Sequence, residues 1–431
     1  MDDHQWGFRT RAVHAGNRPD AATGARAVPI YQTTSFVFED VADAADLFAL
    51  QKYGNIYTRI ANPTVAAFEE RMASLEGGIG AVAAASGQAA ELLVFTALAG
   101  TGEHIVASSA LYGGTHSLLD LTLRRLGIET TFVPADDPAA FAAAARPDTK
   151  AFYTEIVANP SGVVADLTAL ADAAHACGIP LVVDSTLATP HLCRPFEHGA
   201  DVVVHSATKF IGGHGTSMGG VVVESGRFDW ANGRFPRMTE PVAGYGNLRF
   251  WENFAEYGFC TQVRVEQLRD LGACLAPFNA FLLLQGLETL PLRMDAHVAN
   301  ALRLAEYLAG HPAVAWVAYA GLESSPYHGL ARRYLPRGPG AVFSFGVRGG
   351  YEGGQAFIQA VELASHLANV GDTRTLVIHP ASTTHRRLSH EDQVAAGVGP
   401  DLVRVSVGIE DLDDIIWDFD RALAEATKAG E

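Results

Sequence analysis

The feature that most constrains this chain is a regular alternation of short apolar runs and alanine-rich helical segments. Runs such as HIVASS (104–109) and IPLVVDST (179–186) alternate with segments such as AAELLVFTALAG (89–100) and LTALADAAHACG (167–178). Strands separated by helices in this way form a mostly parallel, doubly wound sheet with helices on both faces. Ligands of such α/β sheets bind beyond the carboxyl ends of the strands. We therefore predict an α/β domain with its site at one sheet edge.

The 431 residues are enough for more than one packed domain. Residues 1–62 are rich in turn formers, show little periodicity, and are predicted to form an arm that packs on a neighbouring subunit. Residues 63–275 hold the alternating pattern, and residues 276–431 hold helices followed by strand-like runs, which predict a smaller C-terminal α+β domain. The aromatic, glycine-rich segment 221–271 is predicted to be a long excursion near a pocket or an interface.

Charge and composition exclude several classes of function. The formal net charge of -17 argues against binding to nucleic acid or to an anionic membrane surface. No long apolar run and no signal-like start are present, so we expect a cytoplasmic protein. The four cysteines form no CxxC pair and no HExxH spacing occurs, so neither disulfides nor a metal site is expected.

Residues that could bind or react with a ligand stand at the ends of three predicted strands. They are Ser86, Gly87 and Gln88, then Asp184, and then Ser206, Thr208 and Lys209. The carboxyl ends of parallel strands open on one edge, so an amine, an acid and a helix N-terminus can meet at one ligand. Pyridoxal phosphate needs a lysine for its aldehyde, a carboxylate for its ring nitrogen and N–H groups for its phosphate. The sequence therefore predicts a pyridoxal phosphate site.

Each of these residues also has an ordinary structural explanation. A single Asp at a strand end is usually a cap or turn residue, and a single Lys is usually a surface charge. Gly78, Gly80 and Ala83 also match the GxGxxA pattern of dinucleotide sites, with Glu103 as the acid. In this chain those glycines end a helix and open an apolar run, which is the wrong context for that pattern. The joint set of strand ends favours pyridoxal phosphate.

These residues stand in motifs that resemble a known family, the pyridoxal phosphate enzymes of cysteine and methionine metabolism. The resemblance runs from about Thr10 to the C-terminal helix, and its motifs are VPIYQTTSF, YTRIANPT, SGQAA, LYGGT, ANPSG, VVDST, HSATKFIGGHG, HPASTTH and VRVSVGIED. It implies fold type I, the fold of aspartate aminotransferase. It also implies a homotetramer, built as a dimer of dimers with shared active sites.

The resemblance implies roles for individual residues. Lys209 resembles the lysine that forms the Schiff base, Asp184 the partner of the ring nitrogen, and Tyr112 the aromatic side chain that stacks on the ring. The residues that resemble phosphate ligands are Ser86, Gly87, Gln88, Ser206 and Thr208. Tyr57 and Arg59 resemble arm residues that reach the phosphate of the neighbouring subunit's cofactor, and Tyr57 also resembles a substrate contact.

The remaining expected contacts concern the ring oxygen and the substrate. Asn159 resembles the residue that binds the ring oxygen of the cofactor, although Asn before Pro160 is also an ordinary turn residue. Arg404 resembles the clamp for the substrate carboxylate, to which a planar guanidinium is suited. Asn369 stands where several relatives have a serine near that carboxylate.

Within the family, the segments GNIYTRIANPT and GGHGTSMGGVVVESGRFDW are similar to those of the O-acetylhomoserine sulfhydrylase branch. Gly114 stands where methionine lyases typically have a cysteine. The resemblance implies a γ-replacement in which O-acetylhomoserine and sulfide give homocysteine and acetate. The alternatives are a γ-lyase, a cystathionine synthase that uses O-succinylhomoserine, and a protein that binds the cofactor without turnover.

Overall fold

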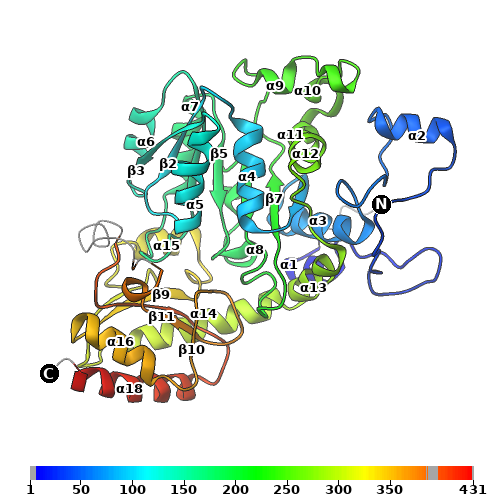
Figure 1. Ribbon diagram of the computed structural model, residues 1–431. Coiled ribbons are helices and arrows are strands. Elements are labelled where there is room, and N and C mark those ends of the chain that lie inside the picture. The colour runs from blue at the N-terminus through cyan, green and yellow to red at the C-terminus, as the bar shows by residue number, and fades with distance from the viewer. Residues whose placement is uncertain (1–5, 385, 387–396, 430–431) are drawn as a thin grey trace.

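The computed structural model describes residues 6–384, 386 and 397–429, and shows two β-sheets that belong to two different parts of the chain (Figure 1). His385, the last residue of the HPASTTH motif, lies outside the described residues. The larger sheet occupies the middle of the molecule, and the smaller sheet lies below it in Figure 1, near the C-terminus.

In the described part of the chain, the large sheet has seven strands in the order β1-β7-β6-β5-β4-β2-β3. Their bounds are β1 Gly80–Ala84, β2 His104–Ser108, β3 Glu129–Val133, β4 Thr149–Glu155, β5 Leu181–Asp184, β6 Val202–His205 and β7 Gly220–Glu224. The neighbouring pairs from β6 to β3 are parallel, whereas β7 runs antiparallel to both β1 and β6. The predicted mostly parallel α/β sheet of fold type I is confirmed.

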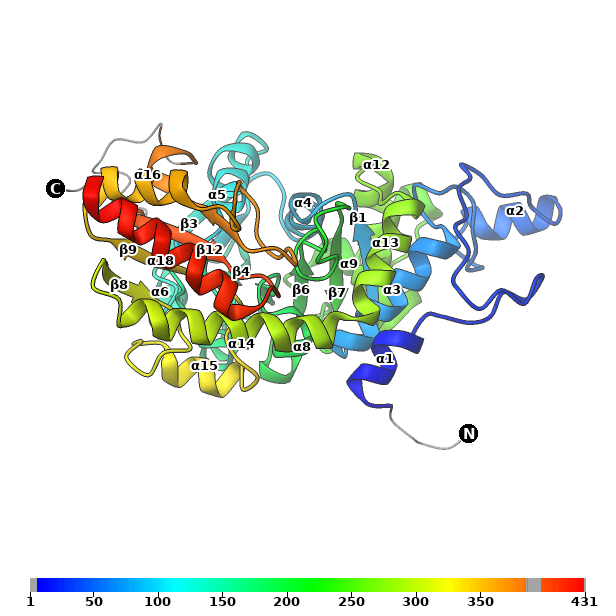
Figure 2. The same ribbon diagram turned by 90° about the horizontal axis from the view of Figure 1, so that it is seen from below.

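Helices cover both faces of this sheet, and Figure 2 shows α4 on one side of the strands and α8 on the other. The bounds are α3 Pro63–Glu76, α4 Gly87–Leu98, α5 Gly113–Ser117, α6 Pro138–Ala144, α7 Leu167–Ala176 and α8 Thr189–Leu192. Helix α3 follows Asn62, whose side chain accepts a hydrogen bond from the N–H of Thr64, and it has Pro63 in its first turn. It ends at Gly77, whose φ of 81° favours glycine.

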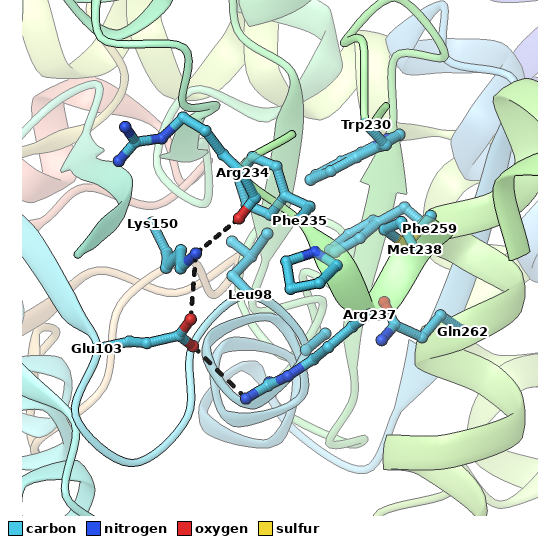
Figure 3. Close-up of a pocket in the computed structure, with 12 residues that line it drawn as sticks. Leu98, Glu103, Lys150, Trp230, Arg234, Phe235, Arg237, Met238, Phe259 and Gln262 are labelled. Atoms are coloured by element: carbon cyan, nitrogen blue, oxygen red, sulfur yellow. Dashed lines mark hydrogen bonds and ion pairs between the residues drawn. The ribbon is translucent and has the colours of Figure 1, made fainter. Parts of the chain in front are cut away.

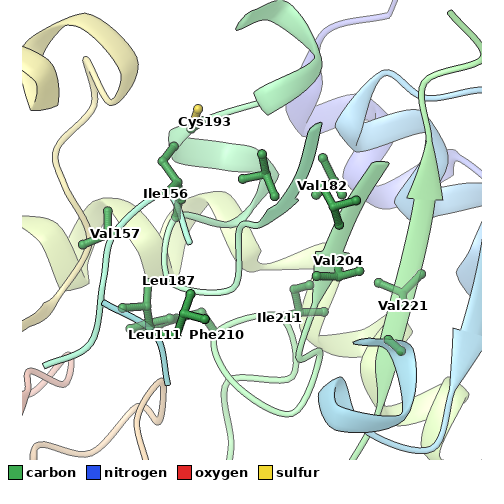
Figure 4. Packing of buried hydrophobic residues seen from close by; sticks show 14 of the residues in the cluster. Leu111, Ile156, Val157, Val182, Leu187, Cys193, Val204, Phe210, Ile211 and Val221 are labelled. Atoms are coloured by element: carbon green, nitrogen blue, oxygen red, sulfur yellow. The ribbon is translucent and has the colours of Figure 1, made fainter. Parts of the chain in front are cut away.

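The core lies between the sheet and its helices, and strands β1, β5, β6 and β7 are mostly aliphatic. Val182, Val204 and Val221 come from three adjacent strands, and are completely or almost completely buried (Figure 4). Phe210 and Ile211, which follow Lys209, are buried in the same cluster. Since strands covered on both faces need apolar side chains on both, these runs do not alternate with polar residues. This packing anchors the backbone on both sides of Lys209.

The C-terminal part contains the smaller sheet, in the order β10-β11-β12-β9-β8. Its strands are β8 Val314–Ala318, β9 Val342–Val347, β10 Ser365–His366, β11 Leu376–Ile378 and β12 Leu402–Ser406. Its helices are α13 Pro277–Glu288, α14 Leu290–Ala309, α15 His328–Tyr334, α16 Gly350–Ala360 and α18 Leu412–Ala429. Helix α14 runs along the molecule, and α18 packs against α16 (Figure 2). The boundaries at 62/63 and 275/276 remain predictions.

The N-terminal segment contains α1 Phe8–His14 and α2 Val41–Phe48, and most of its other residues are irregular. It packs on α3 and α13 through its first helix, α1, whereas the part that carries α2 extends away from the rest of the protein (Figure 1). Val37 and Tyr53 are 99% and 84% exposed, which is unusual for apolar side chains of this size. In a single chain this segment therefore leaves apolar surface in water.

The excursion predicted for residues 221–271 differs from the structure at its start, because Val221–Glu224 belong to strand β7, which lies between β1 and β6 in the large sheet. The short helices that follow are α9 Pro236–Thr239, α10 Phe250–Phe254, α11 Gly258–Gln262 and α12 Arg269–Leu271. The Trp230 and Phe259 rings stack with centroids 4.7 Å apart. The buried Glu224 carboxyl accepts hydrogen bonds from the Trp230 indole and the Cys260 N–H, so this segment is fixed to the sheet. No helix among the described residues has the length and apolar composition needed to span a bilayer.

The burial of Phe152 generates a stability prediction. Its side chain is fully buried in β4 and packs edge-on against Phe141, with ring centroids 5.4 Å apart. We expect Phe152→Ala to lower the free energy of unfolding by about 3–5 kcal/mol, because it leaves a cavity in the core. Urea denaturation measures this loss. The exposed Leu126 is the control, since Leu126→Ala should change the free energy by no more than about 0.5 kcal/mol; equal losses for both variants would contradict the packing described.

Candidate active site

A cavity of about 300 Å³ opens at the carboxyl ends of β4, β5 and β6, where the smaller sheet meets the larger one. Its lining residues are Ser86, Gly87, Gln88, Glu91, Tyr112, Glu155, Val157, Asn159, Asp184, Thr186, Leu187, Ser206, Thr208, Lys209, Met218, Ala368, Asn369, Val370 and Arg404. All the predicted site residues except Tyr57 and Arg59 line it. Parallel strands present their carboxyl ends at one edge, which brings these distant positions together.

Lys209 follows β6 and directs its amine into this cavity. Its Nζ donates a hydrogen bond to Oδ1 of Asn369. Burial, and secondly the positive charge of Arg404, lower the pKa of the Lys209 amine to about 8. An amine with a pKa near 8 is neutral and nucleophilic in a far larger fraction of molecules at neutral pH than an ordinary lysine.

Asp184 is the last residue of β5, and its carboxylate lines the same cavity as Lys209. Its Oδ1 accepts a hydrogen bond of 2.7 Å from the N–H of Thr186. Burial raises the pKa of this carboxyl group, while the Thr186 hydrogen bonds and the electrostatic effect of the nearby His205 oppose that rise. A buried carboxylate of this kind is stabilised when a cationic ring nitrogen lies beside it.

The turn before α4 offers N–H groups to an anion. Ser86 caps the helix, and its Oγ accepts a hydrogen bond of 3.1 Å from the N–H of Ala89. A Cβ on Gly87 would lie 2.6 Å from Cβ of Ser206, so only glycine fits where these two segments meet. The Ser206 N–H donates to Oγ1 of Thr186 at 2.8 Å. A helix N-terminus lined by small polar residues is suited to a phosphate group.

Tyr112 lies directly before α5 and lines the same cavity. Its side chain is 52% exposed, and its N–H donates to the Glu155 carboxylate at the end of β4. The N–H of Asn159 donates to the same carboxyl group. Glu155 thus holds the backbones of two residues that are predicted to touch the cofactor.

Arg404, on β12 of the smaller sheet, is the cationic side chain of this part of the cavity. Its Nη1 lies 3.4 Å from Oδ1 of Asn159, and its Nη2 donates to the carbonyl oxygen of Asn369 at 3.2 Å. Burial lowers the pKa of Arg404 to about 10, so the guanidinium is still charged at neutral pH. Among the described residues no carboxylate forms an ion pair with this part-buried guanidinium, so it is free to donate hydrogen bonds to a substrate carboxylate.

Tyr57 and Arg59 do not line the cavity of their own chain. Both lie in the N-terminal segment, where the Arg59 guanidinium sits 5.3 Å from the centre of the Tyr57 ring. The predicted roles of these residues involve a neighbouring subunit, and remain predictions.

Sequence reasoning missed Glu91 and Glu155. Glu155 could have been found, because it ends the strand-like run TKAFYTE and pairs directly with Asp184 across the sheet. Glu91 lies one helical turn after Gln88, so helical spacing places both side chains on one face. Within an apolar segment, however, Glu91 gives no sign that it faces a buried site.

A second, much smaller cavity surrounds Lys150 (Figure 3). Lys150 pairs with Glu103 at 3.1 Å and donates to the carbonyl oxygen of Arg234 at 2.6 Å, and Arg237 lies 3.5 Å from Glu103. Glu103, the acidic residue of the GxGxxA pattern, therefore forms structural ion pairs with Lys150 and Arg237. Among the residues with described side chains, no group of three or more His, Cys, Asp or Glu could hold a metal ion.

The large cavity fits pyridoxal phosphate. It is large enough for a small ligand, and holds a nucleophilic amine, a buried carboxylate, an aromatic ring and a helix N-terminus. The close approach of Gly87 to Ser206 brings the start of α4 against the segment that follows β6, where the phosphate would lie. The residues would meet each chemical requirement of the cofactor, while their individual contacts remain predictions.

Comparisons with known proteins agree with this chemistry. The family described as Cys/Met metabolism PLP-dependent enzyme matches residues 9–424. An O-acetyl-L-homoserine sulfhydrylase of Leptospira meyeri is 49% identical over 96% of each chain, and a homocysteine synthase of Schizosaccharomyces pombe is 53% identical over 97% of this chain and 98% of its own.

A solved structure has the same fold. It is a Campylobacter jejuni protein described as an O-acetylhomoserine (thiol)-lyase, and contains a pyridoxyl-lysine phosphate. It is 37% identical, covers 97% of this chain and 100% of its own, and superimposes with a TM-score of 0.94. The match of the family model to almost the whole chain, together with these relatives, shows that the chain belongs to the Cys/Met metabolism family of pyridoxal phosphate-dependent enzymes.

Proposed function

We propose that this protein is an O-acetylhomoserine sulfhydrylase, which converts O-acetyl-L-homoserine and sulfide to L-homocysteine and acetate. The observation that carries the proposal is the single cavity in which Lys209, Asp184 and Arg404 meet. Support also comes from relatives of nearly equal length that bear the names O-acetyl-L-homoserine sulfhydrylase and homocysteine synthase. The protein is proposed to act in the cytoplasm, where it would catalyse a step of methionine biosynthesis.

In the proposed reaction, Arg404 holds the substrate carboxylate by two parallel hydrogen bonds. The cofactor, when bound, supplies an electron-withdrawing ring that stabilises negative charge on the substrate carbons. Asp184 would keep a positive charge on the ring nitrogen, Tyr112 would cover the ring face, and Asn159 would bind the ring oxygen. The turn at Ser86, Gly87 and Gln88, with Ser206 and Thr208, holds the phosphate.

Lys209 is the base of the reaction. Its free ε-amine would take the proton from Cα of the substrate and move protons at Cβ, while acetate leaves from Cγ and sulfide adds at the same carbon. Asn369 lies within hydrogen-bonding distance of this amine and of Arg404, which supports a role for it in placing both. Because the amine has a lowered pKa, it can both take and return a proton near neutral pH.

The N-terminal arm, residues 1–62, is proposed to complete the site of a neighbouring subunit. Its exposed apolar side chains, Val37 and Tyr53 among them, need a partner surface. On this proposal Arg59 and Tyr57 reach the neighbour's phosphate, and the working protein is a dimer of dimers. Residues 63–275 form the cofactor domain, and residues 276–431 the smaller domain.

Product analysis tests the proposed reaction. O-acetyl-L-homoserine with sulfide should give homocysteine and acetate, and Lys209→Ala should lower this turnover about a thousandfold or more, because the base and the covalent anchor are lost. O-succinylhomoserine, and cysteine in place of sulfide, are the comparison reactants. Release of ammonia and a 2-oxo acid as the main products, with or without sulfide, would identify a γ-lyase and contradict the proposal.

The lowered pKa of Lys209 predicts the pH dependence of cofactor capture. Only the neutral amine attacks the aldehyde, so the rate at which cofactor-free protein binds pyridoxal phosphate should rise with pH, with a midpoint at about 8, and level off above it. Stopped-flow absorbance measures this rate. Arg404→Gln removes a positive charge that lowers the pKa, so its midpoint should lie higher. A rate in the unaltered protein that still climbs at pH 10 would mean an ordinary lysine.

Mixed subunits test whether Arg59 acts on a neighbouring site. Arg59→Ala alone should weaken pyridoxal phosphate binding about tenfold or more, and Lys209→Ala alone should abolish turnover. After the two variants are unfolded and refolded together, a mixed dimer has one site with both residues intact, so at a pyridoxal phosphate concentration too low to fill Arg59→Ala the mixture should be more active than either variant alone. The double variant, refolded by itself, is the control. Failure of the mixture to exceed the two separate variants would show that Arg59 does not act in trans.

A further inference from the structure

Three carboxyl groups are buried together on one side of the proposed cofactor cavity. They belong to Asp184 on β5, Glu155 on β4 and Glu91 on α4, and all three line the cavity. Glu91 is only 3% exposed. The mechanism above uses Asp184, and Glu155 holds two backbone N–H groups, but Glu91 has no role in either.

The Glu91 carboxyl group lies at the centre of a hydrogen-bond network from three elements. Gln88 Nε2 donates to its Oε2 at 2.7 Å. Thr115 Oγ1 donates to its two oxygens at 2.8 and 3.0 Å, and Tyr153 OH donates to its Oε1 at 2.8 Å. Gln88 belongs to the phosphate turn, and Thr115 to the helix that follows Tyr112. Glu91 therefore connects two segments that hold opposite parts of the proposed cofactor.

The surroundings of Glu91 disfavour a second negative charge. The ionisable groups that face it are Asp184 on β5 and Tyr153 on β4, and Glu155 lies in the same cluster. Burial, and secondly the charge of Asp184, raise the pKa of Glu91 to about 8, although its three hydrogen-bond donors act in the opposite direction. Two buried carboxyl groups at one site do not both ionise readily, so one of them keeps its proton.

We propose that Glu91 is a positioning residue of the cofactor site, and that it works as a neutral carboxylic acid that ties Gln88 to Thr115 and leaves the negative charge on Asp184. The inference rests on the proposal that this cavity holds pyridoxal phosphate. A neutral acid satisfies the same partners, because the hydroxyl groups of Thr115 and Tyr153 accept as well as donate hydrogen bonds. The neutral amide of a glutamine can do the same, whereas an aliphatic side chain leaves the Tyr153 hydroxyl without this partner and leaves Gln88 and Thr115 only the 3.3 Å hydrogen bond between them.

The first measurement is the affinity of the cofactor-free protein for pyridoxal phosphate at pH 7, followed by the absorbance of the bound cofactor. Glu91→Gln should bind within about twofold of the unaltered protein, while Glu91→Leu should bind about tenfold or more weakly. Thr115→Val, which removes one link, should weaken binding by an intermediate factor. Glu224→Gln is the matched control: Glu224 is another buried acid, 1% exposed, and bonds Trp230 and Cys260 outside the cavity, so binding should not change.

The second measurement reports the proton on Glu91 without any use of substrate. The infrared difference spectrum between the unaltered protein and Glu91→Gln should contain the C=O stretching band of a protonated carboxylic acid at pH 6, and lose it at pH 10, because the pKa of Glu91 is about 8. This readout does not require sulfhydrylase activity, and it distinguishes the two proposals: an unaltered protein that binds no pyridoxal phosphate contradicts the proposed function, whatever the band shows.

Three results would overturn the inference about Glu91. Equal loss of cofactor affinity in Glu91→Gln and Glu91→Leu would mean that the site needs a charged carboxylate. Unchanged affinity in Glu91→Leu would mean that Glu91 positions nothing. Absence of the protonated-acid band at pH 6 would mean that Glu91 is already ionised. Weak binding confined to Glu91→Leu and Thr115→Val, together with the band, is the result that supports it.

Discussion

The site depends on the removal of a few ionisable groups from water. Burial acts in opposite directions on amines and acids: it lowers the pKa of Lys209 to about 8 and raises the pKa values of Asp184, Glu155 and Glu91. The amine becomes a nucleophile and a base, and the acids keep protons more readily. Both effects require a dry environment, which the aliphatic strands behind the cavity provide. The hydrophobic core of the large sheet is thus a condition for the chemistry proposed at its edge.

The smaller domain also positions the lysine. Arg293, on α14, is almost fully buried and donates to the carbonyl oxygens of Phe210 and Ile211, directly after Lys209. Gly371, from the segment that carries Asn369, approaches so closely that a Cβ there would lie 2.6 Å from the N of Phe210. These contacts fix the backbone next to Lys209 to two segments of the C-terminal part of the chain, helix α14 and the segment around Gly371. A change in the packing of the smaller domain would therefore shift the position of the Lys209 amine as well as that of the Arg404 guanidinium.

Much of the fold could be predicted from local patterns. The alternation of apolar runs and helical segments predicted the mostly parallel sheet, because the spacing of apolar residues in strands and helices is a local property of the sequence. The strand Val221–Glu224 was missed as part of an excursion, because an apolar run beside an irregular segment does not reveal its partners. Its antiparallel place between β1 and β6 depends on hydrogen bonds to strands far away in the sequence. Asp184, Lys209 and the turn at Ser86 could be found because they end predicted strands or begin a helix.

The sequence by itself determined the kind of sheet, the edge at which a ligand binds, and the family to which the chain belongs, since these follow from periodicity and from motifs of neighbouring residues. Only the tertiary structure decided which buried acids surround Asp184, that Asn369 meets Lys209, and that Glu91 links two distant segments. The reason is physical. The charge state of a buried group depends on its depth and on the groups within a few ångströms of it, and neither is fixed until the strands and the two sheets have packed.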